Sequence, residues 1–286
     1  MPEPIVITTA AEMQARSREI LRSGKSVGFV PTMGALHAGH RTLIDRARRE
    51  NDIVVVSIYV NPTQFGPDED LENYPRALDA DKKICAAADV DYIFAPVTLY
   101  DQDARAFVLV GELTDALEGI SRPGHFRGVA TVVTKLLCIV RPDRAYFGRK
   151  DAQQLIIIQR LVHDLNLGCE VVPCEIAREP DGLALSSRNR YLSASERHQA
   201  LALFKALNYC RDQVERGARD AMNLLQGMTE ILEREMDIEI DYVAIVDAHT
   251  LQDLKTLSGD VLVALAVKVG ATRLIDNTRF EGLTQE

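Results

Sequence analysis

An alternation of short apolar runs with helical patterns, sustained over about the first 170 residues, constrains the fold of this chain most strongly. The apolar runs expected to form strands lie at residues 5–7, 26–30, 53–60, 92–94, 144–147 and 169–173, and Pro31 is expected to end the second of them. Helices are expected from the capping-box pattern at Thr9 and Glu12 to about residue 22, and at residues 40–50, 71–88, 128–139 and 151–166. Strands that alternate with helices form a parallel sheet covered on both faces, so we predict a Rossmann-like α/β domain.

The remainder of the chain has a different pattern. Ser193 and Glu196 form a second capping box that opens a long helix, and residues 219–236 are expected to form another. Strands are expected at residues 240–246 and 261–267, with a weaker candidate at 273–276. We therefore predict two domains, a Rossmann-like domain at residues 1–176 and a smaller α+β domain at residues 177–286.

Composition and charge exclude several classes of protein. The net charge is −9, so no nucleic-acid partner is expected, although a local cationic pocket could still bind a small phosphate ligand. The five cysteines include no C-x-x-C pair, which predicts reduced and mostly buried thiols rather than a disulfide framework or a zinc site. No signal-peptide pattern and no apolar stretch long enough to span a bilayer are found in the sequence. We therefore expect a cytoplasmic protein without a membrane contact.

The loop at residues 31–40 is the most informative segment. Ligands of parallel sheets bind beyond the carboxyl ends of the strands, which points to the loops after Val30, Val60 and Phe147. Gly34 and Gly39 let the backbone approach a ligand closely, and the following helix N-terminus offers free N–H groups to phosphate oxygens. A P-loop is excluded, because His40 and Arg41 occupy the positions of its Lys and Ser/Thr.

Three further patterns indicate a nucleotide site. The H-x-G-H sequence of His37 to His40 resembles the HIGH signature of the nucleotidyltransferase superfamily, although a four-residue pattern on its own is more often structural. In this position the two histidines could donate hydrogen bonds to phosphates. The loop at residues 182–193 resembles the mobile KMSKS-type loop of that superfamily, although an ordinary turn before the Ser193 cap would also explain it. At residues 147–154, Lys150 is a cation suited to a phosphate, Asp151 is a natural N-cap, and Gln154 falls either on the ligand side or on a solvated face.

Several long motifs in order make the chain resemble the pantoate–β-alanine ligase family. They are P-T-M-G-A-L-H-A-G-H at 31–40, N-P-T-Q-F-G at 61–66, E-D-L-E-N-Y-P-R at 69–76, G-H-F-R-G-V at 124–129, L-S-S-R-N-R-Y-L at 185–192 and R-L-I-D-N at 273–277. The resemblance implies an ATP-dependent ligase in which pantoate first forms pantoyl adenylate and pyrophosphate. The β-alanine amine then displaces AMP and gives pantothenate, the precursor of coenzyme A. It also implies a homodimer and a C-terminal domain that acts as a lid over the reaction.

The family's residue roles carry over motif by motif. The resemblance gives His40 the role of proton donor and places His37, Lys150, Ser186, Ser187 and Arg188 on the phosphates. Residues expected to contact ATP are Met33, Gly34, Ala35, Leu36, His37, Ala38, Gly39, His40, Gly148, Arg149, Lys150, Asp151, Ala177, Leu185, Ser186, Ser187 and Arg188. Gln64 is expected to contact pantoate and β-alanine, and Gln154 to contact pantoate. Further pocket candidates are Asn61, Tyr74, Arg122 and His125.

The metal and one unusual residue are left open by the resemblance. Mg²⁺ is expected to arrive with ATP and to be held largely by phosphates and water, with Asp81 as a candidate ligand and no prosthetic group. Arg149 stands where the family usually has Glu. It either strengthens phosphate attraction beside Lys150 or points into solvent, and we expect the second.

Rival functions fit the sequence less well. A nucleotidylyltransferase acting on a phosphate acceptor would share H-x-G-H but would not need the segment at 61–66 or the long C-terminal part. A tRNA synthetase would need a basic RNA-binding region, which the acidic balance opposes. A non-catalytic nucleotide-binding protein would have no use for the full set His37, His40, Lys150 and Arg188.

Overall fold

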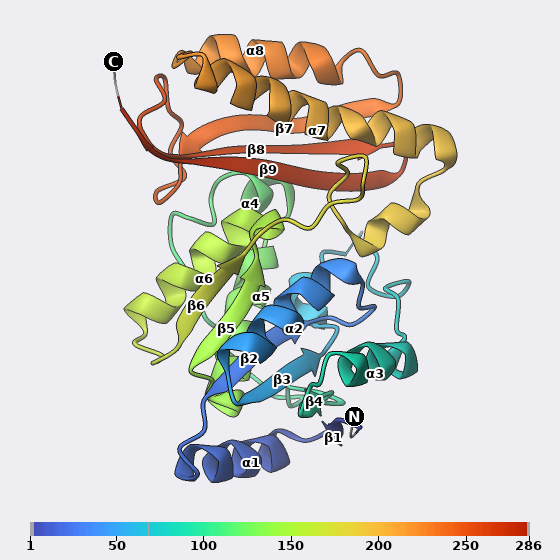
Figure 1. Cartoon of the computed structure of the whole chain (residues 1–286), viewed down its shortest axis with the longest axis vertical. Helices are drawn as coiled ribbons and strands as arrows, with labels where there is room; N and C mark the ends of the chain where they lie inside the picture. The colour runs from blue at the N-terminus through green and yellow to red at the C-terminus, as the bar shows by residue number, and fades with distance from the viewer. Residues whose placement is uncertain (1–2, 68, 285–286) are drawn as a thin grey trace. The chain divides into compact units, whose positions relative to one another are not determined.

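The computed structural model describes residues 3–67 and 69–284, and these form two compact units (Figure 1). The first unit comprises the chain up to Arg149 together with Ile157–Glu175. The second comprises Lys150–Ile156 together with the chain from Ile176 onward.

The first unit contains a six-stranded sheet in the order β1-β4-β3-β2-β5-β6. Its strands are β1 (Ile5–Ile7), β2 (Val27–Thr32), β3 (Ile53–Ile58), β4 (Tyr92–Phe94), β5 (Arg144–Gly148) and β6 (Glu170–Cys174). Every neighbouring pair is parallel. The alternation of apolar runs and helices therefore predicted the sheet correctly.

The order of the strands determines which face of the sheet each connecting helix covers. They are α1 (Ala10–Arg22), α2 (Ala38–Glu50), α3 (Leu78–Ala87), α4 (Glu118–Ser121), α5 (His125–Val140) and α6 (Ala152–Asp164), with single turns η1 (Pro62–Gln64) and η2 (Arg149–Asp151). Connections between parallel strands are right-handed, so helices on connections that run in opposite directions across the sheet cover opposite faces. The connections through α2 and α3 run one way, and those through α1 and α5 run the other.

The direction of winding reverses between the neighbouring strands β2 and β5. From β2 the chain proceeds to β3 on one side, whereas from β5 it proceeds to β6 on the other. Such a reversal leaves a crevice at the carboxyl ends of the two strands, which is where open α/β sheets bind ligands. The loop carrying His37 and His40 follows β2, and the segment beginning at Gly148 follows β5.

Some element boundaries differ from the prediction. Strand β2 continues through Pro31 to Thr32, because its pairing with β5 ends at Phe29 and the missing N–H breaks no bond there. The helix predicted at 71–88 begins only at Leu78, since Pro75 disfavours helix in the residues before it. Strand β3 ends at Ile58, two residues earlier than predicted.

The second unit packs two helices on a three-stranded antiparallel sheet of order β7-β8-β9. Its elements are the turn η3 (Ser187–Tyr191), helices α7 (Ala194–Glu215) and α8 (Ala221–Leu232), and strands β7 (Ile238–Asp247), β8 (Gly259–Val269) and β9 (Thr272–Leu283). Figure 1 shows α7 and α8 side by side along the sheet, where their apolar faces form one core with β8. The α+β prediction is confirmed, and the weak strand candidate at 273–276 is part of the long strand β9.

The capping box predicted at the start of α7 is present. The Ser193 hydroxyl accepts from Glu196 N at 3.2 Å, and the Glu196 carboxylate accepts from Ser193 N at 2.7 Å. Within the part of the chain that the structure describes, no helix is both long enough and apolar enough to cross a membrane.

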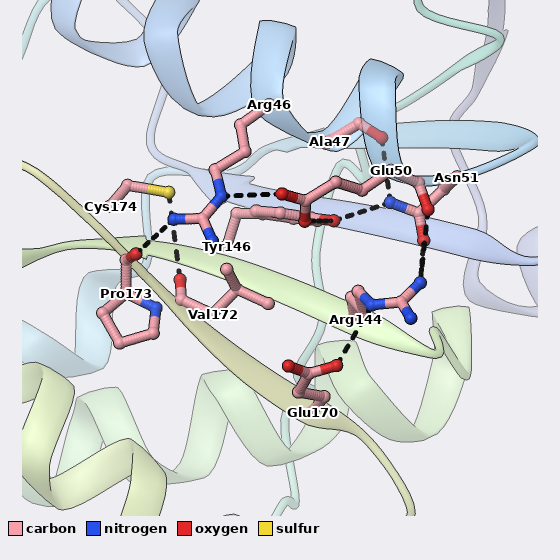
Figure 2. A network of polar contacts seen from close by, with 10 residues as sticks. All are labelled: Arg46, Ala47, Glu50, Asn51, Arg144, Tyr146, Glu170, Val172, Pro173 and Cys174. Carbon is pink, nitrogen blue, oxygen red and sulfur yellow. Dashed lines mark hydrogen bonds and ion pairs between the residues drawn. The ribbon is translucent and has the colours of Figure 1, made fainter.

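A polar network fixes the C-terminal end of α2 to β5 and β6 (Figure 2). Arg46 of α2 donates to the Pro173 carbonyl at 2.7 Å and to the Glu50 carboxylate at 2.9 Å. The Tyr146 hydroxyl of β5 donates to Glu50 and accepts from Asn51 Nδ2 at 2.7 Å. Because these polar groups satisfy one another, the network fixes the axis of α2, whose opposite end carries the two histidines.

The absence of a side chain at Gly28 of β2 leaves space for the Asn51 side chain in this network. A Cβ atom on Gly28 would lie 2.5 Å from Asn51 Nδ2 and 2.9 Å from its Cγ, so any larger residue must displace the amide. Asn51 is buried and also donates to the Ala47 carbonyl at 2.8 Å, so it has little freedom to move.

Replacing Gly28 with Ala should therefore lower the free energy of unfolding by about 1–3 kcal/mol, the usual cost of overpacking a core. Urea denaturation of the full chain measures this loss. The matched control is Gly111→Ala, because a Cβ at Gly111 meets no atom within 4 Å and should leave stability nearly unchanged. Equal stability of the two variants would contradict the packing argument.

Candidate active site

The loop between β2 and α2 is held by one buried carboxylate. Asp81 of α3 is 1% exposed, and its two oxygens accept from Leu36 N at 2.7 Å and Ala35 N at 3.0 Å. Burial raises the pKa of Asp81, while these two hydrogen bonds act against the rise. Because both oxygens bind loop amides, the structure gives Asp81 the task of shaping the loop.

A second anchor and an unusual backbone complete the loop. The Thr32 hydroxyl donates to the Ser57 carbonyl at 2.7 Å and accepts from Gly34 N at 3.1 Å. Gly34 and Ala35 have φ angles of +85° and +51°, a region that is strained for residues with a side chain. The conformation therefore favours glycine at Gly34, and a Cβ there would crowd Asp81 Oδ2 at 3.0 Å.

His37 and His40 form a capping box at the start of α2. His37 Nδ1 accepts from Gly39 N at 3.1 Å, and His40 Nδ1 accepts from His37 N at 3.3 Å. A backbone N–H can only donate, so both Nδ1 atoms are unprotonated and each ring carries its proton on Nε2. The ring centroids are 4.1 Å apart.

The protonation state of His40 follows from its surroundings. Burial, and then the neighbouring His37, lowers the pKa of His40 to about 3. The imidazole is therefore neutral near pH 7 and presents an Nε2–H hydrogen-bond donor.

Gln64 lies in a cluster of amides beside this loop. Asn61 Nδ2 donates to Gln64 Oε1 at 3.0 Å, and Gln64 Nε2 donates to Met33 Sδ at 3.2 Å. The Tyr100 hydroxyl donates to Asn61 Oδ1 at 3.0 Å, which sets the orientation of the Asn61 amide. The side-chain carbonyl of Gln64 already accepts a hydrogen bond from Asn61. The side-chain NH₂ group is therefore the part that can donate hydrogen bonds to a ligand's oxygen atoms.

His125 and Arg122 support the backbone of Gln64. His125 Nδ1 donates to the backbone carbonyl of Gln64 at 2.8 Å, and Arg122 Nη1 lies 3.1 Å from His125 Nε2. Burial, followed by the Arg122 charge, lowers the pKa of His125 to about 4. Arg122 binds the Glu69 carboxylate through two nitrogens, each at 2.7 Å.

The structure thus brings together most of the predicted residues of the first unit. Asn61 and His125 contact Gln64, Arg122 contacts His125, and Tyr74 packs edge-on against Phe65 with centroids 5.8 Å apart. Tyr100 was missed by sequence reasoning, because a tyrosine in a loop carries no pattern of its own.

The predicted residues of the second unit lie on two segments. Lys150 and Asp151 belong to η2 and Gln154 to the first turn of α6, where its side chain is half-buried. Ala177 and Leu185 are joined by a hydrogen bond from Leu185 N to the Ala177 carbonyl at 2.9 Å. Ser186 caps η3, and its hydroxyl accepts from Arg188 N at 3.3 Å. Ser187 and Arg188 open that turn.

Arg149 does not extend into solvent as we expected. Its Nε atom lies 3.0 Å from the Glu175 carboxylate, and its side chain is only 26% exposed. The Glu175 side chain is largely exposed, so this ion pair contributes little stability. Glu175, which directly follows β6, thus offsets the positive charge of Arg149 at a position where the family usually has Glu.

The cysteines and potential metal ligands add no second site. Cys85, Cys174 and Cys210 are buried, and all five thiols are free. Among the residues that the structure describes, no group of three or more His, Cys, Asp or Glu side chains is placed to hold a metal ion.

Comparison with known proteins identifies the family. The model of the family described as pantoate-beta-alanine ligase matches residues 5–279. A pantothenate synthetase of Caldicellulosiruptor saccharolyticus is 49% identical over 275 residues, which are 96% of this chain and 98% of the relative. One from Heliobacterium modesticaldum is 54% identical over 274 residues, covering 95% and 98% of the two chains.

Solved structures agree with this match. The pantothenate synthetase of Thermus thermophilus has a TM-score of 0.90 at 44% identity and covers 96% of this chain and 98% of its own. A pantoate-beta-alanine ligase of Francisella tularensis, complexed with beta-gamma ATP and β-alanine, has a TM-score of 0.78 at 34% identity, with 96% and 97% covered. The resemblance seen in the sequence motifs is confirmed: the chain belongs to the pantoate–β-alanine ligase family and is a ligase that forms pantothenate.

Proposed function

We propose that this ligase uses ATP to condense pantoate with β-alanine through a pantoyl-adenylate intermediate. In the first step a pantoate carboxylate oxygen attacks the α-phosphorus of ATP, and pyrophosphate leaves. In the second step the β-alanine amine attacks the acyl carbon, AMP leaves, and the amine loses a proton. Adenylation is needed because a free carboxylate is a poor acylating agent at neutral pH. The ligands of the Francisella relative, beta-gamma ATP and β-alanine, support the substrates proposed for this chain.

The paired histidines at the start of α2 carry the proposal. Both have Nδ1 occupied by a backbone N–H, and the neutral His40 presents its Nε2–H at the end of the sheet where α/β proteins bind ligands. Neutral donors fixed beside a helix N-terminus stabilise the charge that develops on phosphate oxygens during displacement. We therefore propose that His40 donates a hydrogen bond, and not a proton, to the leaving pyrophosphate, with His37 beside it.

The remaining roles follow the chemistry of each group. We assign Gln64 to pantoate and β-alanine through its NH₂ group, and Gln154 to pantoate. A cation, hydroxyls and a guanidinium suit the charge of phosphates, so the residues assigned to them are Lys150, Ser186, Ser187 and Arg188. The backbone around Gly34 and Gly39 would accept the close approach of ATP.

Magnesium, assembly and location remain predictions. Mg²⁺ would enter with ATP and be held mainly by phosphates and water, since Asp81 already binds two loop amides. A homodimer is consistent with the exposed apolar side chains of Phe107, Leu109 and Ile120. A cytoplasmic location would supply the ATP that the reaction consumes.

Isotope exchange between pyrophosphate and ATP tests the two-step reaction. The full chain with Mg²⁺ should catalyse exchange when pantoate is present, and β-alanine should not be required, because only the first step is reversed. Exchange should be absent when pantoate is omitted. If protein that binds ATP gave no exchange with pantoate, the adenylate mechanism would be wrong and phosphorylated acceptors would be tested next.

Two variants of His40 distinguish a hydrogen-bond donor from a proton donor. His40→Ala should slow pantoate-dependent exchange by about 10²–10³-fold, the usual cost of losing one such donor. His40→Gln keeps an N–H near the position of Nε2 and should retain clearly more activity. The pH profile of wild-type exchange should also lack an acid limb assignable to His40 near the ordinary histidine pKa, since its own pKa is about 3.

Thermal unfolding of both variants provides the control for folding. Equal, complete loss of exchange in folded His40→Ala and His40→Gln would favour proton transfer. Near-normal exchange in His40→Ala would remove this residue from the mechanism.

A further inference from the structure

We propose that Asp276 and Asn277 of β9 position the two phosphate-contacting segments of the second unit, and that they act on the reaction through those segments. Asn277 would position Lys150, and Asp276 would position the loop that carries Ser186 to Arg188. The inference rests on the proposed function, which assigns those residues to ATP phosphates.

Asn277 binds the backbone of Lys150 directly. Its Nδ2 donates to the Lys150 carbonyl at 2.9 Å, across 127 residues of sequence. Asn277 is 6% exposed, so this bond lies in a site where a lost partner is costly. A lysine side chain is long and flexible, and its ammonium reaches a defined place only if its backbone is fixed.

Asp276 binds Arg178, at the start of the segment that leads to Ser186. Its two oxygens accept from the two Nη atoms of Arg178 at 2.6 and 2.9 Å. Asp276 is 3% exposed, and its backbone neighbour adds a bond from Asn277 N to Oδ1 at 2.8 Å. Bidentate pairing of this kind fixes direction as well as distance.

Arg178 connects Asp276 to the turn at Gly182, which precedes Ser186 to Arg188. Its guanidinium also donates to the Gly182 carbonyl at 3.0 Å and lies over the Phe204 ring, 4.8 Å from the centroid. Gly182 has φ of +100°, and a Cβ there would lie 2.1 Å from Phe204, so the turn allows only glycine. The turn is closed by the Arg178–Ala184 bridge, directly before Leu185 and Ser186.

The strand explains how one dipeptide reaches two segments. Successive side chains of a strand point to opposite faces, so Asp276 and Asn277 leave β9 in different directions. A buried Arg–carboxylate pair is seldom a net stabiliser compared with apolar residues of similar volume. Its value here is geometric, which accounts for a motif, R-L-I-D-N, whose members have no assigned contact with substrate.

The test compares Asn277→Leu with wild type in the full chain. Leucine keeps the volume without adding charge and removes the donor to the Lys150 carbonyl. The KM for ATP in pantoate-dependent exchange should rise about tenfold, the scale of one lost hydrogen bond, while the KM for pantoate changes little. Binding of ATP should weaken while binding of adenosine, which has no phosphates, stays the same.

A second variant and a control keep the test independent of folding. Arg178→Lys retains the positive charge but cannot pair with Asp276 through two nitrogens. It should lower kcat with little change in thermal stability. Asp260→Asn is the matched control, because Asp260 pairs with Arg279 at 2.9 Å in the same sheet and should leave exchange unaltered.

The outcomes separate this inference from the proposed function. Absence of pantoate-dependent exchange in wild type would overturn the proposed function itself. Wild-type exchange with unchanged ATP kinetics in folded Asn277→Leu would overturn only the positioning role. A parallel loss of ATP binding, adenosine binding and stability would also overturn it, because the residue would then be merely structural.

Discussion

The Asp81 carboxylate is the contact on which the loop after β2 depends. It is buried, and it exchanges solvation for hydrogen bonds from two consecutive backbone amides, Ala35 and Leu36. Those bonds stabilise a left-handed conformation at Gly34 and Ala35 that would otherwise be unfavourable. The turn so formed sets where α2 begins and which amides remain open to an anion at its N-terminus.

The same geometry determines the chemistry of the histidines. Because α2 is fixed at its far end by Arg46 and Glu50 against β5 and β6, its first turn cannot drift with the loop. Within that turn each Nδ1 accepts a backbone N–H, which leaves both protons on Nε2. Burial then keeps the pKa of His40 low and its imidazole neutral. Fixed neutral donors suit a reaction in which the protein mainly orients ATP and stabilises charge on its phosphates.

Sequence patterns predicted the parts of the molecule that depend on local chemistry. Apolar runs located every strand of the parallel sheet, and the H-x-G-H motif located the histidine pair. Contacts between distant segments left no such pattern: the bonds from the 31–40 loop to Asp81, from Tyr100 to Asn61 and from Asn277 to Lys150 could not be foreseen. The prediction for Arg149 was wrong for the same reason, since its partner Glu175 follows another strand. The predicted helix is absent over residues 71–77, because Pro75 disfavours the helical conformation before it.

The most direct test of this account is the affinity of Asp81→Asn for ATP, measured by calorimetry on the full chain. The amide has nearly the same shape but only one acceptor, so its NH₂ group would face a backbone N–H of the loop. ATP binding should weaken by at least about tenfold, the scale of one lost charged hydrogen bond, while the variant still unfolds cooperatively. ATP affinity equal to that of wild type would show that the carboxylate does not shape the loop for nucleotide binding.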